Sequence, residues 1–235
     1  FIDHCTIQHN ESRGLYVWIP PAGVTIRITN NIFNDNNGAM YVRASAGSNL
    51  AANPIVVENN TVTTGTGTGI YVDSFSAVNG ASVSVSNNSV SGNSAGIFAS
   101  IGRGGTLTVS NNTIAGNAEE GLKLHIGGGV EVTGTNATAP STVIASNNTI
   151  TGNGDSSYDA VWTKADACPG HSHQFSITDN TIFNNPGRGL YFESDCGSGG
   201  DPLTSLHSLT LSNNDIIQNG TAALYLLSVG PVTVT

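Results

Sequence analysis

The residues of this chain that could carry out chemistry recur on equivalent strands of a repeated sequence pattern. Across five consecutive repeats they are Asp73, Lys123, His125, Lys164 and Glu193. Eliminative cleavage of a uronate polysaccharide needs a cation beside the substrate carboxylate, a base for the adjacent carbon proton and an acid for the leaving oxygen. Lys123 or Lys164 could supply the cation, and His125 or a tyrosine the proton transfers. The candidate catalytic residues are therefore Lys123, His125, Lys164 and Asp73, although His125 can also be read as a solvated polar residue on an exposed strand.

The two acidic residues of this group do not form a hydrolase pair. A glycoside hydrolase needs two carboxyl groups about 5 to 9.5 Å apart. Asp73 and Glu193 lie four repeats apart, which is about 19 Å at the strand spacing of a β-sheet.

A six-residue phrase centred on two polar residues, mostly Asn-Asn, recurs along the whole chain and defines the repeat. Successive copies are 24 to 36 residues apart, so the unit is about 30 residues long with variable insertions. The copies occupy residues 28–33, 57–62, 85–90, 109–114, 145–150, 177–182 and 211–216, with residues 2–7 as a divergent first copy. A repeat of this length is typical of a solenoid.

Each repeat predicts three short strands. In one unit an alternating stretch at residues 107–109 runs into the Asn pair, a second strand follows at 113–115, and a Gly/Asn corner leads to a third at 122–126. Asn suits such a corner because it tolerates left-handed backbone and its amide can bond neighbouring turns. Strands joined without helices or hairpins must pair with the equivalent strands of the next repeat. We therefore predict one all-β domain over residues 1–235, a parallel β-helix of about eight coils with three strands per coil and an Asn ladder at one corner.

The composition excludes several classes of protein. Only 10% of the residues are charged and 29 are Gly, which argues against helices. Seven Lys plus Arg against sixteen Asp plus Glu give a net charge of −9, so no nucleic-acid-binding surface is expected. No apolar run approaches the roughly 18 residues of a membrane-spanning helix, so no membrane span is expected.

The strand after the Gly corner should present two columns of side chains outward, because alternate residues of a strand point to opposite faces. The first column is aromatic at seven of its eight positions, which are Tyr16, Tyr41, Tyr71, Phe98, Lys123, Trp162, Tyr191 and Tyr225. The second column is mostly charged or hydrogen-bonding and comprises Trp18, Arg43, Asp73, Ser100, His125, Lys164, Glu193 and Leu227. Aromatic rings beside polar groups form a surface that suits a glycan.

We predict glycan contacts from a subset of these two columns. The predicted contact residues are Tyr16, Trp18, Tyr41, Arg43, Tyr71, Phe98, Trp162, Tyr191, Glu193 and Tyr225. The alternative is that the aromatic column only stabilises the stacked strands, because aromatic residues have high β propensity and pair well across strands.

The repeated phrases, such as residues 85–90 and 109–114, resemble the right-handed parallel β-helix repeats of the pectate-lyase-like superfamily, and the resemblance covers essentially the whole chain. It implies a right-handed coil and a substrate groove along the strands after the Gly corner. It implies no single function, because that fold carries lyases, hydrolases, epimerases, adhesins and phage proteins.

Residues 2–6, Ile-Asp-His-Cys-Thr, look like the Trp-Ile-Asp-His segment of pectate lyases without its Trp. The next strand carries Tyr16 and Trp18 where those enzymes place calcium-binding acids, and no matching Arg motif follows. The tandem-aspartate and Gly-His-Gly pattern of polygalacturonases is also missing. We therefore expect neither a calcium site nor a catalytic Arg carried over from these enzymes.

No cofactor is expected. Calcium has no supporting motif, because residues 34–37 and 152–155 offer oxygen donors without the spacing of a calcium loop. His171 and His173 could bind a metal, but they lie in an insertion without a third ligand, and we expect a solvated loop there.

The cysteines indicate the cellular compartment in which the protein resides. Cys168 and Cys196 fall at similar places in adjacent repeats, so we predict a disulfide between them and an oxidising, extracellular or cell-surface location. Cys5 occupies the Asn-ladder position of its repeat and is expected to be a buried free thiol.

The chain begins and ends inside predicted strands, at Phe1 and Thr235, so we expect an uncapped fragment of a longer protein. The favoured function is an extracellular or cell-surface β-helix domain with a structural or adhesive role, whose aromatic face contacts a polysaccharide. The alternative is a polysaccharide lyase or epimerase that acts on an acidic polysaccharide in the same groove. A third possibility is a spacer rod that makes end-to-end contacts with another β-helix.

Overall fold

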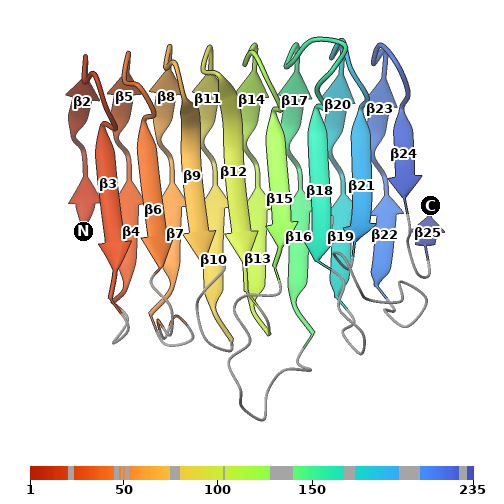
Figure 1. The fold of residues 1–235 in the computed structure, drawn as a ribbon, viewed down its shortest axis with the longest axis horizontal. Coiled ribbons are helices and arrows are strands. Elements are labelled where there is room, and N and C mark those ends of the chain that lie inside the picture. The colour runs from red at the N-terminus through yellow and green to blue at the C-terminus, as the bar shows by residue number, and fades with distance from the viewer. Residues whose placement is uncertain are drawn as a thin grey trace.

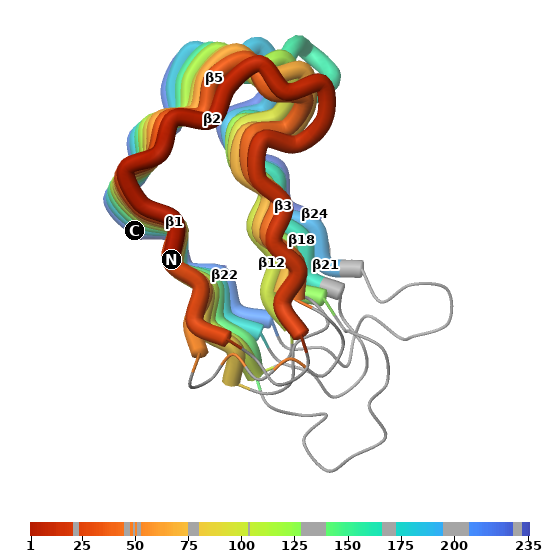
Figure 2. The backbone as a smooth tube through the Cα atoms, turned by 90° about the vertical axis from the view of Figure 1, so that its left-hand side faces the viewer, coloured from red at the N-terminus to blue at the C-terminus, as the bar shows by residue number. Residues whose placement is uncertain are grey.

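The computed structural model describes residues 1–20, 24–44, 48, 50, 53–74, 80–102, 104–127, 140–166, 173–195, 207–227 and 232–235. Over these residues the chain contains β-strands and no helix, and it winds as a solenoid whose axis runs horizontally in Figure 1. The view along that axis in Figure 2 shows successive coils lying behind one another, from red to blue. The predicted right-handed parallel β-helix is confirmed.

Three parallel sheets run the length of the solenoid, and each takes one strand from every coil. Sheet A contains β1 (Ile2–Asp3), β4 (Ile26–Thr29), β7 (Ile55–Glu58), β10 (Ser82–Ser86), β13 (Thr106–Ser110), β16 (Thr142–Ser146), β19 (Gln174–Thr178), β22 (Ser208–Ser212) and β25 (Val232–Val234). Sheet B contains β2 (Thr6–Gln8), β5 (Ile32–Asn34), β8 (Thr61–Thr63), β11 (Ser89–Ser91), β14 (Thr113–Ala115), β17 (Thr149–Thr151), β20 (Thr181–Phe183) and β23 (Asp215–Ile217). Sheet C contains β3 (Leu15–Ile19), β6 (Met40–Ala44), β9 (Thr68–Ser74), β12 (Ala95–Ile101), β15 (Leu122–Ile126), β18 (Val161–Asp166), β21 (Leu190–Asp195) and β24 (Leu224–Leu227).

The strand count agrees with the repeat count. Sheets of nine, eight and eight strands correspond to eight complete coils, with β25 adding one strand beyond them. We number the coils one (β1–β3) to eight (β22–β24).

The core lies between the three sheets and is built from the inward-facing aliphatic residues of every strand. In sheet C the predicted inward pairs of the middle coils, such as Ile70 with Val72 and Leu122 with Leu124, are almost completely buried. Each such side chain contributes about 1.5–3 kcal/mol relative to full exposure. The corresponding residues of the outermost coils, such as Leu15 and Leu224, are only partly buried, because a coil lies on one side of them alone.

The predicted Asn ladder is confirmed at the corner between sheets A and B. Its members are Asn31, Asn60, Asn88, Asn112, Asn148, Asn180 and Asn214. The Asn112 amide donates to Asn148 Oδ1 and to the Val85 carbonyl, both at 3.0 Å, and its Oδ1 accepts from the Asn88 backbone at 2.9 Å. The residue before each ladder position has left-handed backbone, as at Asn111 with φ 56°. One Asn thus turns the chain, and the next binds the adjacent coils.

A second ladder, which the sequence analysis missed, lies at the corner between sheets B and C. It comprises Asn10, Asn36, Asn93, Asn117, Asn153, Asn185 and Asn219, with Gly65 in the third coil. Each member follows the first-ladder residue of its coil by five positions, and this constant spacing was the available signal. At Gly65 a Cβ atom would meet Asn93 Oδ1 and the Asn36 carbonyl, so the gap in the ladder leaves room only for glycine.

The expectation of a solvated loop at His173 is wrong. Its side chain is 1% exposed, and its ring stacks on that of His207 with centroids 5.1 Å apart. The Ser141 backbone N–H donates to His173 Nδ1 at 3.2 Å, and the His173 N–H donates to His207 Nδ1 at 3.1 Å. These imidazoles therefore link consecutive coils at sheet A, as the Asn amides do at the other corners. His171 lies outside the described residues.

We predict that Asn112→Ala destabilises the solenoid by about 3 kcal/mol, because it removes buried hydrogen bonds to Val85, Asn88 and Asn148 in the two neighbouring coils. Urea unfolding followed by circular dichroism measures the change. Thr113→Ala, at the exposed next position, is the control and should cost about 0.5 kcal/mol or less. Equal midpoints for the two variants would show that the ladder is not the main link between coils.

Candidate glycan-contacting face

The outer face of sheet C carries all the predicted contact residues and candidate catalytic residues. The strand register aligns the first column without a slip from Tyr16 in β3 to Tyr225 in β24. The second column runs beside it from Trp18 to Leu227 in the same register. The positions of these side chains are as expected, and their roles in binding or catalysis stay predictions.

In the first four coils the aromatic column is a continuous stack of rings. The centroids of Tyr16, Tyr41, Tyr71 and Phe98 are 5.3, 4.4 and 4.5 Å apart in turn, with interplanar angles of 13° or less. The faces of Tyr41 and Tyr71 are therefore covered by their neighbours. Burial, together with the nearby Asp73 carboxylate, raises the pKa of the Tyr71 phenol. Ring stacking of this kind stabilises neighbouring strands, and whether these rings also contact a glycan stays a prediction.

The rings that remain open lie at the two ends of the sheet. The exposed fraction is 49% for Tyr16, 52% for Trp18 and 46% for Tyr225. Among the described residues of sheet C, these are the aromatic side chains that are about half exposed.

Cationic side chains lie over several of these rings. Arg13 lies 4.0 Å from the Tyr41 centroid and 5.1 Å from that of Tyr16, and Arg188 lies 4.1 Å from Tyr191 and 5.0 Å from Tyr225. Lys123 covers Trp162 at 4.3 Å, and Arg43 lies 5.5 Å from Trp18.

The repeat and the two columns did not predict roles for Arg13 and Arg188. The available signal was the tetrapeptide Arg-Gly-Leu-Tyr, which occurs at residues 13–16 and again at 188–191. In both copies the guanidinium reaches the Tyr of its own coil and that of the next coil.

The second column is a line of ion pairs and hydrogen bonds between neighbouring coils. Arg43 Nε lies 3.3 Å from Asp73 Oδ2, and Ser100 Oγ donates to Asp73 Oδ1 at 2.9 Å. Lys164 Nζ lies 3.6 Å from Glu193 Oε1. In these pairs the protein's own carboxylates already neutralise the cations that a uronate would need.

The remaining candidate catalytic residues are also engaged. Lys123 Nζ lies 3.7 Å from Glu120 Oε1, and the His125 ring meets the Trp162 ring edge-on at 6.2 Å between centroids. The structure thus brings Lys123, His125 and Lys164 onto adjacent coils, but it surrounds them with protein partners.

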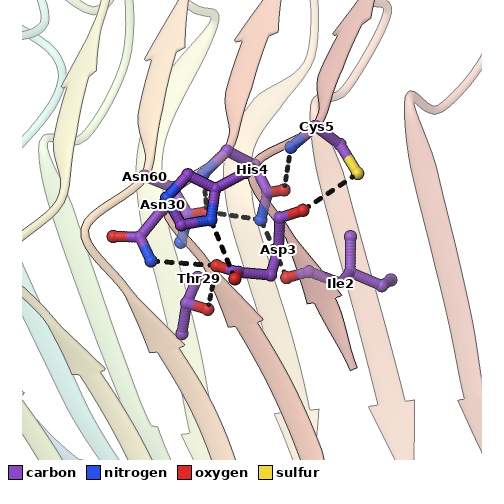
Figure 3. Close-up of polar contacts among 8 residues, drawn as sticks. Ile2, Asp3, His4, Cys5, Thr29, Asn30 and Asn60 are labelled. Carbon is purple, nitrogen blue, oxygen red and sulfur yellow. Dashed lines mark hydrogen bonds and ion pairs between the residues drawn. The ribbon is translucent and has the colours of Figure 1, made fainter.

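The Ile-Asp-His segment of coil one forms a polar cluster on sheet A, away from sheet C (Figure 3). Asp3 Oδ1 accepts from Thr29 Oγ1 at 2.8 Å and from Asn30 Nδ2 at 2.9 Å, and His4 Nδ1 lies 2.8 Å from Oδ2. The hydrogen bonds from Asn30, Thr29 and His4 lower the Asp3 pKa to about 2. This carboxylate holds coil one to coil two.

Cys5 is not buried as expected. Its backbone N–H donates to Asn31 Oδ1 at 2.9 Å, so the ladder register is right. The side chain is exposed, because it belongs to the outermost coil, and its thiol donates to the Asp3 carbonyl at 3.3 Å.

Three parallel sheets joined through Asn corners define a parallel β-helix protein, and a comparison with known families agrees. The model of the right-handed β-helix region matches residues 1–138 and 133–235. The chain therefore belongs to the right-handed β-helix family. No curated protein and no solved structure matches the chain at a significant level.

Some further predictions concern metals, membranes and the disulfide. Within the part of the chain that the structure describes, no group of three or more His, Cys, Asp or Glu side chains is placed to hold a metal ion. Nor does that part contain a helix long and apolar enough to cross a membrane. The predicted disulfide lies outside the described residues, because neither Cys168 nor Cys196 is among them.

We predict that Asp3 titrates with a pKa of about 2, compared with 3.8 for an unperturbed Asp. A lowered folded-state pKa means that the Asp3 contacts stabilise the fold above about pH 3.8 and are lost as the pH falls towards 2. Carboxyl NMR titration measures the pKa directly. The stability advantage of the wild type over Asp3→Asn should shrink across the same interval, and a midpoint near 3.8 would contradict this reading.

We also predict that the stacked and open rings differ in their effect on stability. Tyr71→Ala should cost about 2–3 kcal/mol, because Tyr71 loses ring contacts on both faces. Tyr225→Ala should cost less than about 1 kcal/mol, because the ring is half exposed. Urea midpoints of the two variants decide the matter, and equal losses would mean that the end rings are as structural as the central ones.

Proposed function

We propose that this β-helix is a domain of an extracellular or cell-surface protein with a structural or adhesive role, and that the outer face of sheet C contacts a polysaccharide. The observation that carries the proposal is the position of the open aromatic side chains. Tyr16, Trp18 and Tyr225 lie on one face of one sheet, each with a guanidinium within 5.5 Å of its ring. Rings supply apolar contact area and guanidinium groups supply hydrogen-bond donors for sugar hydroxyls.

The shape of the face supports an extended ligand. The two columns are straight and continue through every coil at the strand spacing of about 4.8 Å, so a polysaccharide could follow sheet C from end to end. Between the open ends, the stacked Tyr41 and Tyr71 present ring edges and hydroxyl groups rather than faces. These groups suit hydrogen bonding along the chain.

The ion pairs support a binding role over a catalytic one. A lyase needs a cation free to neutralise the substrate carboxylate. Lys164 and Lys123 are paired with Glu193 and Glu120, and Arg43 is paired with Asp73. An acidic substrate would have to displace a protein carboxylate at each of these positions.

We predict that an immobilised polysaccharide retards the protein in affinity electrophoresis and that Tyr16→Ala with Trp18→Ala weakens the retardation about tenfold. Loss of two stacking contacts of about 0.5–1.5 kcal/mol each accounts for a change of that size. The control is Ile217→Ala, which removes a side chain of similar exposure, 54%, from sheet B.

Two outcomes would overturn the proposal. If no polysaccharide in a broad panel of neutral and acidic chains retards the protein, sheet C does not contact glycans. If pectin, alginate or a glycosaminoglycan yields unsaturated products, detected by their ultraviolet absorbance, the domain is a lyase and not a binding module.

A further inference from the structure

A pocket of about 340 Å³ opens where coils six to eight turn from sheet B into sheet C. Its polar and aromatic lining comprises Ser156, Ser157, Asp159, Arg188, Thr221 and Tyr225. Ligand sites range from about 300 to 1,000 Å³, so this one suits a single small ring. Apart from Tyr225, none of these residues belongs to the two columns of sheet C.

One wall of the pocket is an enlarged turn in coil six. The connection from Asn153 to Val161 is three residues longer than the connection from Asn185 to Leu190 in the next coil. Figure 1 shows this connection, after β17, arching over towards the neighbouring coil. The Tyr158 carbonyl packs so closely on Gly187 that a Cβ atom would overlap it. The wall is therefore fixed against coil seven by the backbone.

A partly buried ion pair lines the pocket. Asp159 is 4% exposed, and its two carboxylate oxygens accept from Arg188, Oδ1 from Nε at 2.5 Å and Oδ2 from Nη2 at 3.1 Å. Burial raises the pKa of the Asp159 carboxyl, and the Arg188 hydrogen bond works against this rise. The Arg188 guanidinium also lies over the rings of Tyr191 and Tyr225, so it is held by these rings as well as by Asp159.

These groups specify the chemistry of a ligand. The Arg188 guanidinium offers donors, the hydroxyls of the two serines, Thr221 and Tyr225 offer donors and acceptors, and the Tyr225 ring offers an apolar surface. A pyranose has the matching combination of hydroxyl groups and an apolar C–H face. The Asp159–Arg188 pair is formally neutral, so an incoming carboxylate would gain no net charge attraction and would lie beside the Asp159 carboxylate.

We propose that this pocket binds one uncharged pyranose unit, the end residue of a polysaccharide whose following units lie along sheet C. This inference rests on the proposed function and adds the position and charge of the sugar. The enlarged turn of coil six lines one side of the pocket, and Tyr225 joins the pocket to the first column of sheet C.

An exposed residue away from the pocket and from sheet C provides the control. Ile217 of β23 and Tyr225 are similar in exposure, 54% and 46%. A site that depends on the pocket will respond to Tyr225→Ala and not to Ile217→Ala.

The test is saturation-transfer NMR and calorimetry of the whole chain with methyl glucoside, methyl galactoside, methyl mannoside and the corresponding uronates. At least one neutral glycoside should bind at millimolar concentration. Tyr225→Ala and Thr221→Trp, which fills the pocket from an exposed position, should each weaken it at least about tenfold. Ile217→Ala should leave it unchanged. Near-ultraviolet circular dichroism checks that each variant is folded.

The possible results distinguish the neutral ligand class, the pocket and the proposed function from one another. Preferential binding of a uronate would overturn the neutral ligand class, and binding retained in Tyr225→Ala and Thr221→Trp would overturn the pocket. If no monosaccharide binds while a polysaccharide still retards the wild type, the pocket proposal fails and the proposed function stands. If neither occurs, both fail.

Discussion

The amide hydrogen bonds that join each coil to the next are the interaction on which the rest of this structure depends. At two corners an Asn side chain binds the backbone of one neighbouring coil and the side chain of the other. Beside sheet A, two buried and stacked imidazoles each accept a backbone N–H from the preceding coil. Because these groups are buried, leaving any of them unpaired is costly. The ladders therefore fix the height and rotation of every coil, and the straight columns on sheet C follow from that constraint.

The surface chemistry is a consequence of this stacking. When equivalent strands lie in register, equivalent side chains become neighbours, so rings at one position must either stack or be separated by another group. Tyr41, Tyr71 and Phe98 stack, and their ring faces are lost to a ligand. Lys123 ends the stack and covers Trp162. Among the described residues of sheet C, the aromatic side chains that stay about half exposed lie where the columns end, although the first column is aromatic at seven of its eight positions in the sequence.

How much could be predicted from the sequence varies between these features. The strands and both columns follow from the repeat and from the alternation of side chains, and strands such as Thr113–Ala115 and Leu122–Ile126 fall where expected. The second ladder was equally periodic, but its Asn residues also read as ordinary turn residues. The burial of His173 could not be predicted, because an insertion length does not say where the chain re-enters the sheet. Ring orientation and the Arg188–Asp159 pair depend on rotamers and on the path of the coil-six turn, which no periodicity encodes.

Most coils of this solenoid resemble one another closely enough to stack on the wrong neighbour, since the same Asn and aliphatic residues recur in each. The ion pairs differ from coil to coil, and Arg43–Asp73, Lys164–Glu193 and Arg188–Asp159 each join two adjacent coils. If coil seven were looped out during folding, the register would set Asp159 opposite Ala222 and Lys164 opposite Leu227. The buried Asp159 would then lack its guanidinium, a loss of several kcal/mol. The few charged residues of this chain thus favour the native order of the coils, because skipping a coil separates a charged side chain from its partner.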